Sequence, residues 1–225
     1  MQAGTTTLRG MCLLHWRVDP ERLRSRLPAS LSLDVHDGSA WLSLVACRVD
    51  SLRPRGAPRS LGWTYPEAHL RTYVTTGDGD LASYLFAVEC GDPTVARVAT
   101  ATGFPYRRAD AVIDREPDTF RFRSERTGPG APPATVEVAY RPADRPPIVE
   151  RDRWLVKRPV QFASPNGRLR RLTLRAGEYD LRPARATVET NDLFAAEGLP
   201  TPQSPPVARF CPSLTMAAGL PRPVR

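Results

Sequence analysis

The chain has 225 residues, of which 41% are apolar and 25% are charged, and these proportions exclude a disordered or fibrous protein. No stretch approaches the roughly 20 apolar residues of a membrane-spanning helix, and no small-residue cleavage site follows the first apolar run, so we expect one cytoplasmic domain outside the membrane. The formal net charge of +8 invites a nucleic-acid or acidic partner, but the arginines are scattered and interleave with acids, which disfavours that alternative without removing it.

The N-terminal part of the chain predicts a strand, a short helix and a hairpin. Residues 9–18 form an apolar run typical of a buried strand. Asp19 and Pro20 then supply an N-cap and a first helical residue. Residues 31–49 hold two alternating runs joined at Asp37-Gly38, a pair that tolerates the positive φ of a tight turn. These runs therefore predict a hairpin.

Turn residues separate the elements expected downstream. In chain order these are a hairpin of 68–76 with 81–90, a helix at 94–102 opened by Asp92 and Pro93 and closed by Gly103, antiparallel strands at 109–114, 119–126 and 135–142, a helix from Val149 to Lys157, and weak strands at 161–164, 169–177 and 184–191. The Pro-rich segment 204–225 is expected to be an irregular tail. Strands dominate without regular β-α-β alternation, which disfavours doubly wound and TIM-barrel folds.

Residues that usually bind metals or cofactors show no motif spacing. The four cysteines stand far apart, three of them in apolar runs where a thiol acts as a small hydrophobe, and the three histidines lack the spacing of a zinc motif. Neither a Gly-rich phosphate loop nor a G-x-S-x-G elbow occurs. We therefore expect no metal and no cofactor.

Three segments together resemble the acetoacetate decarboxylase-like superfamily, and within it the YqjF-like branch of uncharacterised proteins. They are LLHWRVDPERLRSRLPASLSLDVHDGSAWLSLVACRV, TYPEAHLRTYV and TVARVATATGFPYRRADAVID. The resemblance covers about the first 150 residues well and the last third loosely. It implies a single α+β, mostly β domain over residues 1–225, built as a closed antiparallel β-barrel with two or three short helices and a central cavity.

The resemblance also shows that the reactive lysine of the decarboxylase is absent here. In the decarboxylase the junction between helix and strand carries two lysines, the first of which forms an imine with the substrate ketone. Here the junction reads Gly103, Phe104, Pro105, Tyr106 and Arg107. The single lysine of the chain, Lys157, falls in a charged helical segment that is typical of a solvated face. We therefore predict no Schiff-base decarboxylation.

Strand alternation sets up a polar face between residues 66 and 74. Glu67, His69, Arg71 and Tyr73 share that face, and the resemblance aligns Glu67 with an acidic cavity residue of the decarboxylase. We expect the face to look into the barrel, although a half-exposed strand with its polar face in water remains the alternative.

From these residues we predict a cavity that binds a small, anionic organic ligand, such as a carboxylate. Arg71, Arg107 and Tyr73 are the candidate ligand-binding residues. The candidate proton-transfer residues are Glu67, Tyr106 and His15, although a lone histidine on a strand is more often a core residue. Alternatives are a noncovalent lyase or isomerase acting through an enolate and a barrel that has lost its chemistry, and a homo-oligomer stays open.

Overall fold

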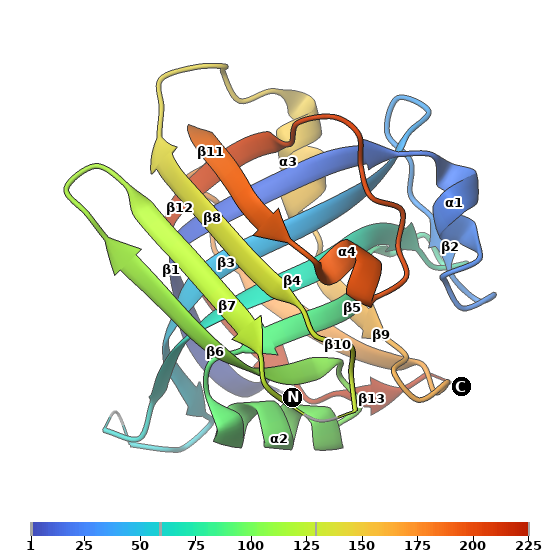
Figure 1. The fold of residues 1–225 in the computed structure, drawn as a ribbon. Helices are drawn as coiled ribbons and strands as arrows, with labels where there is room; N and C mark the ends of the chain where they lie inside the picture. The colour runs from blue at the N-terminus through green and yellow to red at the C-terminus, as the bar shows by residue number, and fades with distance from the viewer. Residues whose placement is uncertain (1, 59, 129, 225) are drawn as a thin grey trace.

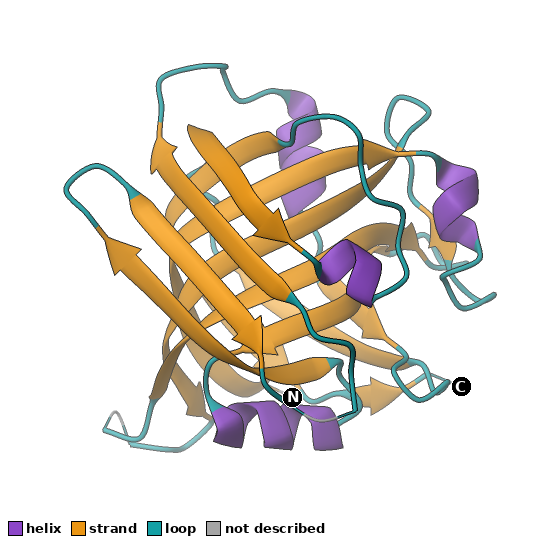
Figure 2. Cartoon of the chain, viewed as in Figure 1, coloured by secondary structure: helices purple, strands orange, loops and turns teal. Residues whose placement is uncertain are grey.

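The computed structural model describes residues 2–58, 60–128 and 130–224, and strands dominate these ranges (Figures 1 and 2). The strands are β1 (Gln2–Val18), β2 (Ser32–Leu33), β3 (Ala40–Pro54), β4 (Trp63–Thr75), β5 (Leu81–Cys90), β6 (Tyr106–Arg115), β7 (Phe120–Arg126), β8 (Thr135–Pro142), β9 (Val160–Ala163), β10 (Arg170–Ala176), β11 (Arg182–Asn191), β12 (Val207–Gly219) and β13 (Arg222–Pro223). The helices are short: α1 (Pro20–Arg24), α2 (Pro93–Ala101), α3 (Glu150–Val156) and α4 (Leu193–Ala196).

The strands close on themselves in two rings that share a wall. In the first ring β1, β3, β4, β5, β9, β10 and β12 pair in succession and return to β1. In the second, nine-stranded ring β6, β7, β8 and β11 connect β5 to β12 instead, and in Figure 1 these four strands lie in front of β1, β3, β4 and β5. The expected α+β, mostly β closed barrel is thus confirmed.

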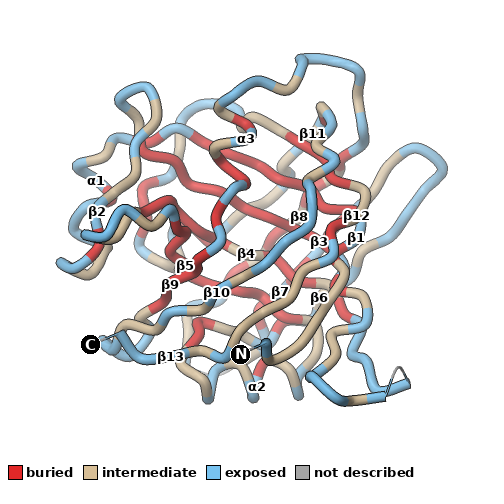
Figure 3. Tube along the Cα trace, turned by 180° about the vertical axis from the view of Figure 1, so that it is seen from behind, coloured by how far each residue is buried: buried red, intermediate tan, exposed pale blue. Residues whose placement is uncertain are grey.

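The shared strands are buried on both faces, which Figure 3 shows as red stretches of β3, β4 and β5. Along β1, Cys12, Leu14 and Trp16 pack into the core of the nine-stranded ring, whereas Leu13 faces the smaller ring. A bulge at Gly10, where φ is +59°, changes the alternation. Leu8 and Met11 consequently face the smaller ring together.

The barrel is mixed rather than purely antiparallel. Strand β5 pairs in parallel with both β6 and β9. The first parallel pair follows from α2, because the helix turns the chain so that the first three residues of β6 lie beside the last three of β5. The Asp92 carboxylate caps α2 by accepting from two backbone N–H groups, and Gly103 ends the helical segment at φ +87°, both as predicted.

The predicted hairpin at residues 31–49 is wrong beyond its turn. Asp37 and Gly38 do take positive φ angles of 50° and 71°, and a bridge joins His36 to Ser39. Residues 32–33, however, form β2 and pair with β4. Both edges of β3 are occupied by β1 and β4, so β3 has no edge left for a hairpin partner.

The C-terminal segment 204–225 is not an irregular tail. It contains β12, a 13-residue strand between β1 and β11 that also pairs with β10 and so closes both rings. Pro212 fits inside this strand because it lies opposite the Gly10 bulge, where the ladder is interrupted. The prediction of an irregular tail was wrong because it rested on the proline content of the segment alone. The four-residue helix α4 was also missed, although two or three helices were expected.

Among the described residues, none of the helices is long and apolar enough to cross a membrane.

Candidate functional site

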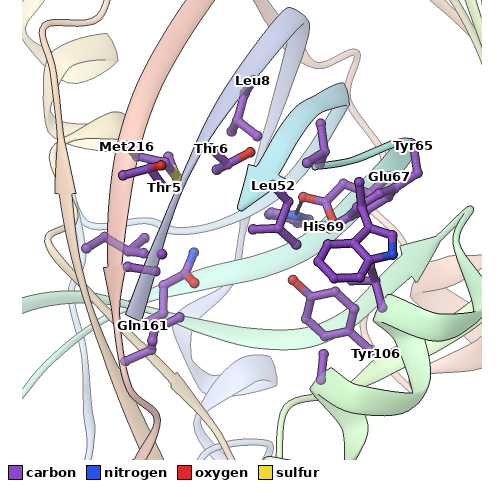
Figure 4. Close-up of a pocket in the computed structure, with 18 of the residues that line it drawn as sticks. Thr5, Thr6, Leu8, Leu52, Tyr65, Glu67, His69, Tyr106, Gln161 and Met216 are labelled. Atoms are coloured by element: carbon purple, nitrogen blue, oxygen red, sulfur yellow. Dashed lines mark hydrogen bonds and ion pairs between the residues drawn. The ribbon is translucent and has the colours of Figure 1, made fainter. Parts of the chain in front are cut away.

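A cavity of about 380 Å³ occupies the interior of the seven-stranded ring, a size typical of small-molecule sites (Figure 4). Its mouth lies between α2 and the starts of β1 and β4, where Val98 and Trp63 are 61% and 37% exposed. Its inner end is lined by Arg71, Arg158 and Gln161, each of them buried. The wall between the two ends is mainly aliphatic.

Strand β4 supplies the polar side of the cavity. Its alternation points Glu67, His69 and Arg71 inward, whereas Tyr73, the fourth residue of the predicted polar face, does not line the cavity. Glu67 Oε1 lies 2.7 Å from His69 Nε2, and Figure 4 shows this pair at the cavity wall. The second oxygen of Glu67 has no hydrogen-bond partner among the described residues. Since buried polar atoms are normally paired, this oxygen is a place for a ligand donor or a water molecule.

Tyr106 reaches the cavity from the start of β6. The turn at Gly103 and the following Phe104-Pro105 direct the chain so that the Tyr106 ring enters beside α2, with its hydroxyl toward the interior in Figure 4. Burial raises the pKa of Tyr106 well above 10, and the negative charge of Glu67 raises it further. Tyr106 is therefore a protonated phenol that donates a hydrogen bond at neutral pH.

Arg71 stands at the inner end without a counter-ion. The residue is 7% exposed, forms no ion pair with the described residues, and has an unpartnered Nε atom. Its guanidinium carbon lies 5.9 Å from the Tyr73 ring centre, which places the charge over an aromatic face. A guanidinium held in a cavity with free N–H groups is a carboxylate-binding group.

Arg158 and Gln161 complete this inner end, and neither residue belongs to a motif that would have identified it beforehand. Arg158 forms an ion pair with Asp34 and lies over the rings of Trp154 and Tyr73, at 4.3 and 4.9 Å from their centres. Its Nη2 atom remains without a partner among the described residues. Gln161 enters from β9, which pairs in parallel with β5 and is therefore separated from β4 by that one strand.

Tyr73 and His15, both predicted at the site, lie behind it. The Tyr73 hydroxyl is 2.6 Å from Ser43 Oγ, which is 2.6 Å from His15 Nδ1, and neither Tyr73 nor His15 lines the cavity. Burial lowers the pKa of His15 to about 3, and the charge of Arg71 lowers it in the same direction. The predicted proton-transfer role of His15 and the predicted ligand contact of Tyr73 are therefore corrected to a buried network supporting Arg71.

Arg107 faces away from the cavity. As the next residue along β6 after Tyr106, it points to the opposite side of the strand, and it is paired in register with Glu89. Glu89 forms an ion pair of 2.6 Å with Arg126, which also contacts Glu197 at 2.8 Å. The prediction that Arg107 contacts the ligand is therefore wrong, because strand alternation places Arg107 beside this ion-pair cluster and not in the cavity.

Lys157 is exposed just after α3 and does not line the cavity. It borders a second hollow of about 580 Å³, which shares Arg158, Leu174 and Tyr179 with the first as a common wall.

The fold is that of the acetoacetate decarboxylase-like barrels of known structure. A solved structure of an acetoacetate decarboxylase-like enzyme from Sphingomonas wittichii RW1 superposes with a TM-score of 0.69 at 18% identity, covering 100% of this chain and 94% of its own. The enduracididine biosynthesis enzyme MppR complexed with pyruvate gives 0.65 at 14% identity, covering 99% and 91%. At these identities the likeness establishes the fold alone.

Sequence places the chain more narrowly. Residues 5–215 match the model of DUF2071, described as an uncharacterized conserved protein, and the chain belongs to this family. The uncharacterized protein YqjF of Bacillus subtilis (strain 168) is 31% identical over 202 residues, which cover 87% of this chain and 82% of YqjF. The resemblance seen in the sequence is thereby confirmed.

Proposed function

We propose that the cavity binds a small organic anion noncovalently, with the negative group of the ligand on Arg71. The observation that carries this proposal is a guanidinium buried to 7% exposure with no carboxylate partner among the described residues. Burying a charge without a counter-ion costs several kcal/mol. An anion that enters the cavity would supply this counter-ion and form the ion pair that Arg71 lacks in the unliganded protein.

Neighbouring groups suit the same ligand. Arg158 and Gln161 add donors at the inner end, and the Tyr106 hydroxyl adds one along the wall. The likeness to MppR, whose structure holds pyruvate, supports an organic acid as the ligand.

The binding mode is noncovalent because no imine-forming amine enters the cavity from the lysine side chains. Tyr106 stands where the decarboxylase family has its reactive lysine, and a phenol forms no iminium. The lone Lys157 is exposed outside the cavity. Incubation with acetoacetate and borohydride, followed by intact-mass measurement, should show no adduct. A stoichiometric adduct that persists in Lys157→Arg would overturn this mode.

The binding itself is tested by thermal shift with a panel of organic acids, acetoacetate and pyruvate among them. We expect at least one acid to raise the Tm of the wild type. Arg71→Gln should abolish this shift and Tyr106→Phe should reduce it, since each removes a donor from the cavity. An unchanged shift in both variants would remove these residues from the site. A panel without any shift in the wild type would contradict the proposal.

A second candidate, noncovalent lyase or isomerase chemistry, is favoured by one observation. Glu67 pairs with His69 at 2.7 Å and lies across from the phenol of Tyr106, so an acceptor and a donor face the same space. Proton abstraction next to a carbonyl would exchange that proton with solvent. Loss of the C–H signal of acetoacetate in D₂O, followed by NMR, should be faster with wild type than with Glu67→Gln. Equal exchange rates in the two proteins would contradict this catalytic candidate and leave ligand binding as the proposed function.

A further inference from the structure

The cavity has two chemically distinct parts. Arg71, Arg158 and Gln161 line its inner end. Between there and the mouth, where Arg53 lies, Glu67, His69 and Tyr106 stand on one side and the rest of the lining is mostly aliphatic. The aliphatic residues come from β1, β3, α2, β10 and β12: Leu8, Met11, Val45, Val49, Leu52, Val95, Val98, Leu172, Leu174 and Met216.

The aliphatic wall is part of the interior rather than of the surface. Leu8, Met11, Val45 and Val49 are at most 4% exposed. In Figure 4, Leu8 and Met216 come from β1 and β12, on the side of the cavity away from Glu67 and Tyr106. An apolar cavity does not hold ordered water well, because water needs two or more polar partners there. The aliphatic wall is therefore better suited to contact a hydrocarbon part of a ligand than to contact water.

The length of the cavity exceeds that of a short oxo acid. Strand β4 advances about 3.3 Å per residue, so Glu67 lies roughly 13 Å along the strand from Arg71, and Trp63 lies a similar distance further toward the mouth. An acid of three or four carbons held on Arg71 would leave most of the wall uncovered. Binding sites usually enclose most of the surface of their ligand.

We infer that the ligand is a monocarboxylate with an apolar tail of at least six carbons, its carboxylate on Arg71 and its tail along the aliphatic wall toward Trp63 and Val98. This inference rests on the proposed function and adds the class of ligand to it. It assigns the selection of ligand chain length to aliphatic wall residues such as Met11, which carry no group that could transfer a proton or bind the carboxylate.

The test is a calorimetric titration of the full chain with acetate, butanoate, hexanoate and octanoate, with pyruvate and octan-1-ol alongside. Each added methylene should lower the Kd about fourfold, the ratio that corresponds to about 0.8 kcal/mol of apolar burial. Octanoate, with four more methylenes, should therefore bind roughly 200-fold to 250-fold tighter than butanoate. Arg71→Gln should weaken every acid by a similar factor, and octan-1-ol should bind more weakly than octanoate.

A pair of matched variants locates the tail. Met11 lines the cavity near the level of Glu67, within reach of an eight-carbon tail held on Arg71, whereas Leu81 is a strand residue that is 42% exposed and lies outside the cavity. Met11→Asn should weaken octanoate at least fivefold and change butanoate much less, while Leu81→Asn should change neither.

The outcomes separate the two proposals. Equal affinity for all chain lengths, or pyruvate binding tighter than octanoate through Arg71, would overturn the apolar-tail inference and leave the proposed function intact. Octan-1-ol binding as tightly as octanoate would overturn the carboxylate contact. No binding of any acid would overturn both.

Discussion

Replacing Arg71 by methionine should stabilise the unliganded protein, although arginine is the residue on which binding depends. Arg71 is 7% exposed and lacks an ion-pair partner among the described residues. Removing its charge relieves a desolvation cost, and methionine fills a similar length with apolar atoms. Because Arg71 borders a cavity rather than closely packed side chains, we expect the gain in the free energy of unfolding to be about 1–2 kcal/mol, at the lower end of the range for replaced buried charges. For a chain of this size that raises Tm by about 2–8 °C.

The matched control makes the same substitution at a buried arginine that is paired. Arg126 has a side chain 1% exposed and contacts Glu89 at 2.6 Å. Arg126→Met leaves that carboxylate buried without a partner, which should cost about 3–5 kcal/mol and lower Tm by about 6–20 °C. Differential scanning calorimetry of both variants measures the two signs directly. A fall in Tm for Arg71→Met comparable to that of Arg126→Met would refute the argument, because it would mean that Arg71 is already compensated.

Two further predictions concern residues behind the cavity. The pKa of His15 is lowered to about 3 in the folded protein, against 6.5 in the unfolded chain. The unfolded state thus binds more protons between these values, so His15 contributes stability that is complete above pH 6.5 and is lost as pH falls toward 3, by up to about 1.4 kcal/mol per pH unit. Urea denaturation from pH 7 to 4 should be less pH-dependent in His15→Gln, and identical slopes would contradict the assignment. At Gly10, where φ is +59°, an added Cβ would lie 3.2 Å from the Phe120 ring, whereas at Gly38, with φ +71°, it would meet nothing within 4 Å. Gly10→Ala should therefore lose more stability than the roughly 1–2 kcal/mol of backbone strain expected for Gly38→Ala, and equal Tm values would show that the ring yields.

Local patterns predicted the residues of the site that a single strand or turn places. The two-residue period of β4 was enough to direct Glu67, His69 and Arg71 into one space, and the helix-ending Gly103 placed Tyr106 at the start of the next strand. The same period, applied to β6, would have turned Arg107 away from Tyr106, so this error was avoidable.

The features that could not be predicted from the sequence depend on pairing between segments far apart in the chain. Arg158 and Gln161 reach the cavity only because β9 pairs in parallel with β5, and periodicity within a strand carries no information about that partner. The strand β12 was hidden by Pro212 and by the prolines that flank the strand, since the bulge at Gly10 that accommodates Pro212 lies some 200 residues away in the chain. His15 has the predicted orientation, but Ser43 and Tyr73 occupy the space in front of it.

The most direct test of noncovalent anion binding in this barrel is the difference electron density of crystals soaked with a bromine-labelled straight-chain carboxylate. We predict a carboxylate within hydrogen-bond distance of the Arg71 guanidinium, the bromine peak along the aliphatic wall, and no density connecting the ligand to a side chain. Density continuous with a protein side chain, or an occupied site outside the cavity with Arg71 left unpaired, would contradict the account.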